Sequence, residues 1–96
     1  MKSITPKHTE IKECIELENG FVIREDYYGY PEGESNLYFL NKEKKELWKA
    51  ELPMDGDVFS NPMTIDGNDA LSGSWKGFDC RISLTDGKIV DKVFTK

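Results

Sequence analysis

The stretch FDCRISLTDGKIVDKVF, Phe78 to Phe94, decides the fold class because its residue order contains a complete β-hairpin. Its first part alternates apolar and polar side chains with a period of two, which is typical of a strand with one buried face. Asp86 and Gly87 follow, and an Asp-Gly pair between two alternating segments is a strong hairpin signal. The stretch therefore predicts two antiparallel strands, 78–84 and 89–94.

Similar signals occur along the rest of the chain, and together they predict an all-β fold of two four-stranded antiparallel meanders. The main turn signals are Glu18-Asn19-Gly20 in the first half and Asp66-Gly67-Asn68 in the second. The expected strands are 11–17, 21–23, 36–40 and 46–52, followed by 63–65, 70–75, 78–84 and 89–94. In the first strand, Ile11, Ile15 and Leu17 are expected to share one face.

Residues 41–52 leave two interpretations open. Trp48, Ala50 and Leu52 alternate with more polar neighbours, which favours a strand whose tryptophan face points inward. The segment is also rich in Lys, Glu, Leu and Ala, and Asn41 is a suitable first residue for a helix. We expect the strand, with the helix as the alternative.

The two halves of the chain repeat one another at a spacing of 43 residues. Leu37, Phe39, Lys45 and Leu47 correspond at this spacing to Cys80, Ile82, Lys88 and Val90. The repeat predicts one domain, 10–96, built from units of about 10–52 and 58–96 and joined by a linker that contains Pro53 and Pro62. Residues 1–9 lack apolar periodicity and are expected to form a flexible N-terminal arm.

The segments NLYFLNKEKKELWKAEL and CRISLTDGKIVDKVF resemble the blade repeats of PQQ-type, quinoprotein-like β-propellers. In that pattern Lys44 stands where the turn glycine falls, and Asp91 stands where the tryptophan falls. The chain also resembles a group of small uncharacterised bacterial proteins, which implies no activity. Two blades cannot close a propeller, so we expect the sheets to pack as a small sandwich or flattened barrel. A monomer is favoured over a homodimer, and no quinone or other cofactor is expected.

Bulk properties exclude several classes of function. The net charge is −5, and the thirteen Lys and Arg residues are scattered among eighteen acids, so a nucleic-acid partner is not expected. The chain has no apolar run long enough for a membrane span and no signal peptide, which predicts a cytoplasmic protein without a membrane partner. In that reducing compartment Cys14 and Cys80 are expected to be free, buried thiols.

No pattern of catalytic or metal-ligating residues is recognisable. The single histidine, His8, lies on the expected arm, where no partner would position it as a base. Asp55, Asp57, Asp66 and Asp69 lack the spacing of a calcium loop and are interpreted as turn residues. We therefore predict no catalytic residue and no metal site, and a carboxylate-based hydrolase remains only as an alternative because acids are so abundant.

The tyrosine-rich stretch DYYGYPEGES, Asp26 to Ser35, is the candidate functional segment. It is four residues longer than its counterpart in the second repeat, where Trp75 lies, and loops that exceed the repeated frame are common places for binding. Trp75 itself is expected to pack against the core more readily than to stay exposed. The candidate contact residues for a partner are Tyr27, Tyr28, Tyr30, Glu32, Glu34 and Trp75.

These residues predict a protein-binding module, similar in kind to an inhibitor or immunity protein, that uses an aromatic loop to bind a basic protein. Tyrosine and tryptophan are enriched at protein interfaces because they bring a large and stiff contact area. The alternative is an accessory structural domain whose aromatic residues complete its own core.

Overall fold

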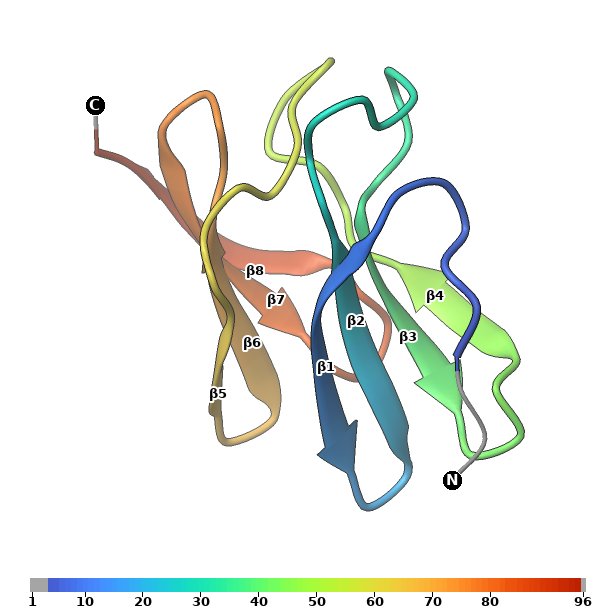
Figure 1. The fold of residues 1–96 in the computed structure, drawn as a ribbon. Helices are drawn as coiled ribbons and strands as arrows, with labels where there is room; N and C mark the ends of the chain where they lie inside the picture. Colours follow the sequence, from blue (N-terminus) through green and yellow to red (C-terminus); the bar gives the residue numbers. More distant parts are fainter. Residues whose placement is uncertain (1–3, 96) are drawn as a thin grey trace.

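The computed structural model describes residues 4–95, and these form eight strands with no helix among them (Figure 1). The strands build two antiparallel sheets that do not close into a barrel. The first sheet contains β1 (Ile11–Leu17), β2 (Gly20–Glu25), β3 (Leu37–Asn41) and β4 (Glu46–Lys49). The second contains β5 (Thr64–Asp66), β6 (Asp69–Gly73), β7 (Phe78–Ser83) and β8 (Ile89–Phe94). The predicted all-β class with two four-stranded meanders is therefore confirmed.

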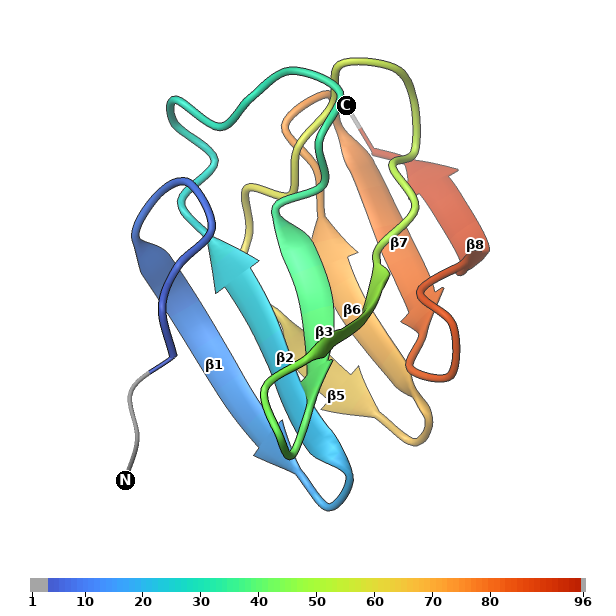
Figure 2. The same cartoon turned by 90° about the vertical axis from the view of Figure 1, so that its right-hand side faces the viewer.

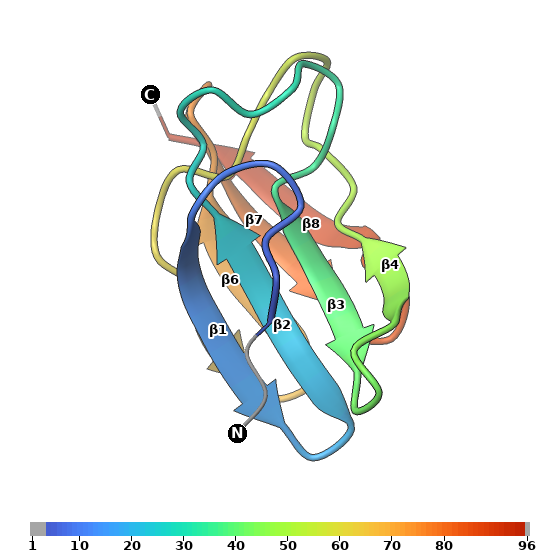
Figure 3. The ribbon, with the colours of Figure 1, turned by 45° about the vertical axis from the view of Figure 1, so that its right-hand side comes forward.

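The two sheets lie one behind the other and bury a shared core (Figures 2 and 3). In each sheet the strands are neighbours in chain order, as tight turns between antiparallel strands dictate. Phe39 on β3 and Ile82 on β7, which correspond in the repeat, both point into this core and are fully buried. The buried members of the core are Val22, Leu37, Phe39, Trp48, Ala50, Phe59, Met63, Ala70, Cys80, Ile82 and Leu84.

The alternative helix over residues 41–52 is wrong, because this segment turns and then forms β4. Trp48 lies opposite Phe39 on β3, and the two rings stack with their centroids 5.4 Å apart. The indole nitrogen of Trp48 donates a hydrogen bond of 3.1 Å to the backbone oxygen of Leu84, which fixes the first sheet to the second. Burial of this large ring outweighs the moderate helix propensity of the surrounding residues.

A bulge in β1 separates the three apolar residues that were expected to share one face. The pairing with β2 shifts between Ile11 and Glu13, so that Ile11 packs on the outer side of the sheet while Ile15 and Leu17 pack in the core. Glu13 lies two residues before Ile15 and shares its inner face, where its carboxylate lies 2.7 Å from Nε of Arg24. The same carboxylate accepts hydrogen bonds from the backbone nitrogen of Met63 at 2.8 and 3.0 Å.

The outer face of the first sheet carries a second apolar cluster, which consists of Phe21, Ile23, Tyr38 and Leu40. Ile4 packs against this cluster, and Lys7 places its ammonium group 4.6 Å from the centre of the Tyr38 ring. The segment that was expected to be a flexible arm therefore contacts the sheet from residue 4 onward. The first three residues of the predicted arm lie outside the described part of the chain.

The buried carboxylate of Glu25 holds this segment in place. It accepts hydrogen bonds from three successive backbone nitrogens, at 2.6 Å from Lys7, 3.1 Å from His8 and 3.0 Å from Thr9. It also accepts a hydrogen bond from the hydroxyl group of Tyr38. A buried charge needs such compensation, and here the N-terminal segment supplies most of it.

Both cysteines are free thiols, as expected, but only one of them is buried. Cys80 lies in the core between the sheets, whereas Cys14 lies on the exposed side of the edge strand β1. The prediction that both are buried is wrong for Cys14, because alternation along β1 directs this position away from the core.

Candidate functional site

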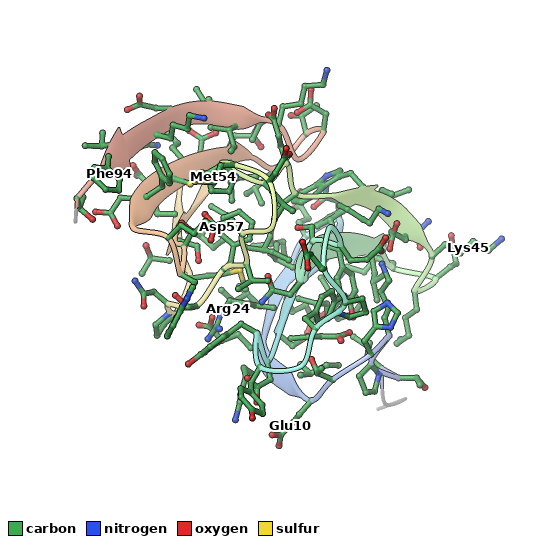
Figure 4. All side chains as sticks on the ribbon, turned by 90° about the horizontal axis from the view of Figure 1, so that it is seen from above. Glu10, Arg24, Lys45, Met54, Asp57 and Phe94 are labelled. Carbon is green, nitrogen blue, oxygen red and sulfur yellow. The ribbon has the colours of Figure 1, made fainter. Side chains whose placement is uncertain are left out.

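The candidate contact residues come from loops that gather at one end of the sandwich, which we call the loop end (Figure 1). The loop end comprises residues 26–36, 53–62 and 74–77, and it is seen from above in Figure 4. Backbone hydrogen bonds tie the second and third of these loops together, with Trp75 N donating to Val58 O at 2.9 Å. Loops from both sheets therefore form one continuous surface.

Tyr27 and Trp75 are the pair that joins the two sheets at this end. Their rings stack with centroids 5.3 Å apart and planes inclined by 25°. Trp75 is 57% exposed, so the expectation that it packs in the core is wrong. The cause is the tight turn 74–77, in which Gly77 N donates to Ser74 O at 3.1 Å and Gly77 adopts a φ of 103°. This turn places Trp75 at a corner, where the loop of the other sheet meets one side of its ring.

Tyr28 points away from the protein and is 82% exposed, the highest value among the exposed large apolar side chains. The carboxylate of Asp26 accepts a hydrogen bond of 3.0 Å from the backbone nitrogen of Tyr28. An aspartate that bonds to the backbone two residues further on stabilises a turn, and this turn directs Tyr28 outward. Tyr28 therefore stays a candidate for a contact with a partner.

Tyr30 belongs to the interior, unlike Tyr28. It is 8% exposed, and its ring meets the ring of His8 edge to face with centroids 5.0 Å apart. Burial, together with the negative charges of Glu25 and Glu34, raises the pKa of the Tyr30 hydroxyl above its usual value. Its position identifies Tyr30 as a residue that closes the sandwich beneath the loop, rather than a contact residue.

The predicted acidic residues also differ from one another. Glu32 is exposed, and its carboxylate lies beside the turn at Gly56, 3.7 Å from the point where a Cβ atom of residue 56 would stand. Glu34 lies 3.7 Å from Nζ of Lys49, and both side chains are more than two-fifths exposed, so this ion pair contributes little to stability. Both carboxylates therefore add negative charge to the loop end.

Two residues of the linker were not recognised from the sequence as part of this end. Met54 is 46% exposed and widens the apolar surface (Figure 4). Asp57 is buried, and its carboxylate accepts hydrogen bonds from the backbone nitrogens of Val58 at 2.9 Å and Lys76 at 3.0 Å. Asp57 was interpreted as a turn residue, and its second contact, with Lys76 in the neighbouring turn, has no signal in the sequence.

Among residues 4–95, no group of three or more His, Cys, Asp and Glu side chains could hold a metal ion. Burial and the nearby Asp57 raise the pKa of the Cys80 thiol to about 11, and burial and Glu16 also raise the pKa of Cys14. Both thiols are thus protonated at neutral pH, which makes them poor nucleophiles.

In the described part of the chain, no helix is long and apolar enough to cross a membrane. Comparison of the chain with models of known protein families, with curated proteins and with solved structures found no match.

Proposed function

We propose that this protein is a binding module that uses the loop end to hold a basic protein partner, in the manner of an inhibitor or immunity protein. The observation that carries the proposal is the stack of Tyr27 on Trp75, which presents a half-exposed tryptophan beside the outward-pointing Tyr28. In this proposal the monomer is the binding unit and acts in the cytoplasm, where its free thiols stay reduced.

The stack of Tyr27 on Trp75 preorganises the exposed ring for binding. A tryptophan held by a stacked tyrosine loses little conformational entropy when a partner covers it, and such rings are frequent anchors of protein interfaces. Glu32 and Glu34 lie in the same loop as Tyr27 and Tyr28, and the whole chain carries a net charge of −5. A partner with a basic surface would therefore approach this end with favourable electrostatics.

The test compares two variants of the full chain that lose exposed apolar side chains at different places. The first combines Tyr28→Ser with Trp75→Ser at the loop end. The control is Leu47→Ser on β4, because Leu47 and Trp75 are both 57% exposed. Proteins that are crosslinked to the wild-type chain in its own cells are identified, and each is then purified and titrated with the three chains by calorimetry.

We expect at least one captured protein with a net positive charge whose affinity falls about 30-fold or more in the double variant and less than about twofold in the control. Higher salt should weaken the same complex. If every captured protein binds the double variant as tightly as the wild type, the loop end is not the binding surface and the accessory structural domain is the better description.

A further inference from the structure

The outer faces of the two sheets differ in cover and in charge. On the first sheet, Ile4 and the segment that follows it lie across the apolar cluster around Phe21 and Tyr38. On the second sheet, strand pairing places a mostly polar set of side chains on the outer face, and the linker residues Asn61 and Pro62 line a hollow with several of them. We call this set the acidic face; it consists of Thr64, Asp66, Asp69, Leu71, Gly73, Asp79, Arg81, Ser83, Asp91 and Val93.

The acidic face carries an uncompensated negative charge. It contains four aspartates and one cation, Arg81, and therefore has a net charge of −3, while the whole chain has a net charge of −5. The guanidinium of Arg81 is already engaged, at 3.0 Å from Asp66 and 2.9 Å from Asp69. Asp79 and Asp91 have no ion pair with any residue of the described chain, so the free charge is concentrated on β7 and β8.

Two neighbouring hollows lie beside these unpaired aspartates, between the acidic face and the loop end. The larger has a volume of about 410 Å³ and is lined in part by Leu71, Asp91 and Val93. The smaller has a volume of about 280 Å³ and is lined in part by Trp75 and Phe78. Asn61 and Asp79 line both hollows, so the two hollows are adjacent and lie between the acidic face and the exposed tryptophan; we call the two together the groove.

The chemistry of this groove matches an arginine side chain more closely than a lysine. A guanidinium is planar, forms two parallel hydrogen bonds with a carboxylate and stacks on aromatic rings. Here Asp79 supplies a carboxylate and Trp75 an aromatic ring in the same hollow, whereas the Phe78 ring already packs on Phe94 and has the Lys92 ammonium 5.4 Å from its centre. A lysine ammonium could pair with the carboxylate but lacks the flat surface for stacking, and it loses more hydration.

We propose that the acidic face holds an extended, arginine-bearing segment of the partner protein, with one arginine in the hollow between Trp75 and Asp79. This inference rests on the proposed function and names the part of the partner that would give it specificity. The segment continues from the loop end along β7 and β8, where Asp91 meets a second basic side chain and Val93, which is 54% exposed, meets an apolar one.

The test uses a defined probe in place of the unidentified partner. Capped peptides of three arginines or three lysines are titrated into the isotopically labelled full chain, and amide shifts are followed by NMR. We expect the arginine peptide to shift amides of β6, β7, β8 and Trp75, and to bind more tightly than the lysine peptide. Combining Asp79→Asn with Asp91→Asn should weaken this binding about tenfold.

The matched control combines Glu18→Gln with Glu43→Gln, which removes the same two charges at exposed turn positions of the first sheet. The inference is overturned if both double variants lose affinity equally, because bulk charge then explains the binding. It is equally overturned if the lysine peptide binds as tightly or if the shifts occur on another face. The dispersion of the amide spectrum shows whether each variant is folded.

Binding measurements with the captured partner distinguish failure of this inference from failure of the proposed function. If the partner binds the Asp79→Asn/Asp91→Asn chain normally but loses affinity for the Tyr28→Ser/Trp75→Ser chain, only the present inference fails. If the arginine peptide binds the acidic face but no captured protein requires Tyr28 and Trp75 for binding, the proposed function fails, while the groove is still shown to bind arginine.

Discussion

The side chain of Asn36 forms hydrogen bonds with both backbone groups of Phe59, as a neighbouring strand would. Its amide nitrogen donates to Phe59 O at 2.8 Å, and its oxygen accepts from Phe59 N at 2.8 Å. The same nitrogen donates to Glu25 O at 2.7 Å. Because Phe59 also forms an isolated bridge with Ser74, the fully buried Asn36 connects the first sheet through the linker to the second.

We predict that Asn36→Asp lowers the free energy of unfolding by about 2–4 kcal/mol. The variant keeps the shape and one acceptor but loses the two donated hydrogen bonds, so that the oxygens of Phe59 and Glu25 stay buried without partners. Urea denaturation measures the loss. Asn19→Asp, at an exposed turn position, is the control and should change stability by less than about 0.5 kcal/mol. Equal effects of the two substitutions would show that Asn36 does not connect the sheets.

The stability of the protein should depend on the ionisation of Glu25. Burial disfavours the charged form, but the hydrogen bonds from Lys7, Thr9, Tyr38 and His8 outweigh it and hold the pKa of Glu25 below its usual value. The contribution of a group with a lowered pKa is fully present above the unfolded value of about 4.3, and it is lost as the pH falls through the folded value. We therefore expect stability to decline with acid below about pH 4.3 through this group.

Glu25→Gln tests this dependence. A neutral amide oxygen is a weaker acceptor for three backbone donors, so we expect a loss of about 1–3 kcal/mol at pH 7 and a flatter decline of stability in acid. Hydrogen exchange at the amides of Lys7, His8 and Thr9 should accelerate in the variant. Glu18→Gln, at an exposed turn, should retain the wild-type acid profile, and the hypothesis would be falsified if both variants gave the same profile.

The sequence predicts strand positions well because alternation reports burial on one face. The sequence does not predict contacts between residues that are distant along the chain. The role of Glu25 could not be predicted, since its partners Lys7 to Thr9 come from a segment without apolar periodicity. The bulge in β1 has no signal in its residue types either. At the candidate site, the aromatic loop was identified, but the opposite directions of Tyr28 and Tyr30 depend on turn geometry and on the nearby His8.

The repeat identifies a strained position in the first meander. Lys44 and Gly87 are 43 residues apart and both adopt positive φ angles, 66° and 78°, and Lys44 is the only residue other than glycine with such an angle in the described chain. A left-handed conformation costs a residue other than glycine roughly 1 kcal/mol or more. Glycine avoids this cost, but it also raises the conformational entropy of the unfolded chain, which cancels part of the gain in stability. We expect Lys44→Gly to raise the free energy of unfolding by about 0.5 kcal/mol.

Gly87→Ala provides the opposite change at the corresponding position. The added Cβ would lie 2.5 Å from the Trp48 ring, and the alanine would have to adopt a φ of 78°. We therefore expect the free energy of unfolding to fall by about 2–4 kcal/mol. Thermal and urea unfolding compare the two variants. A loss of stability in Lys44→Gly would mean that the contact of Lys44 with the Phe21 ring, at 5.2 Å, outweighs the backbone strain.

Single substitutions at Tyr28 and Tyr30 separate the surface role of the loop from its core role. Tyr28→Ser should change the free energy of unfolding by less than about 0.5 kcal/mol, because the side chain is already in water. Tyr30→Ser removes a buried ring that packs on His8, and should cost about 3–4 kcal/mol. Chemical denaturation of both variants gives the difference. A similar cost at the two positions would mean that Tyr28 also packs inward in solution, and the surface proposed to hold a partner would then lose its most exposed residue.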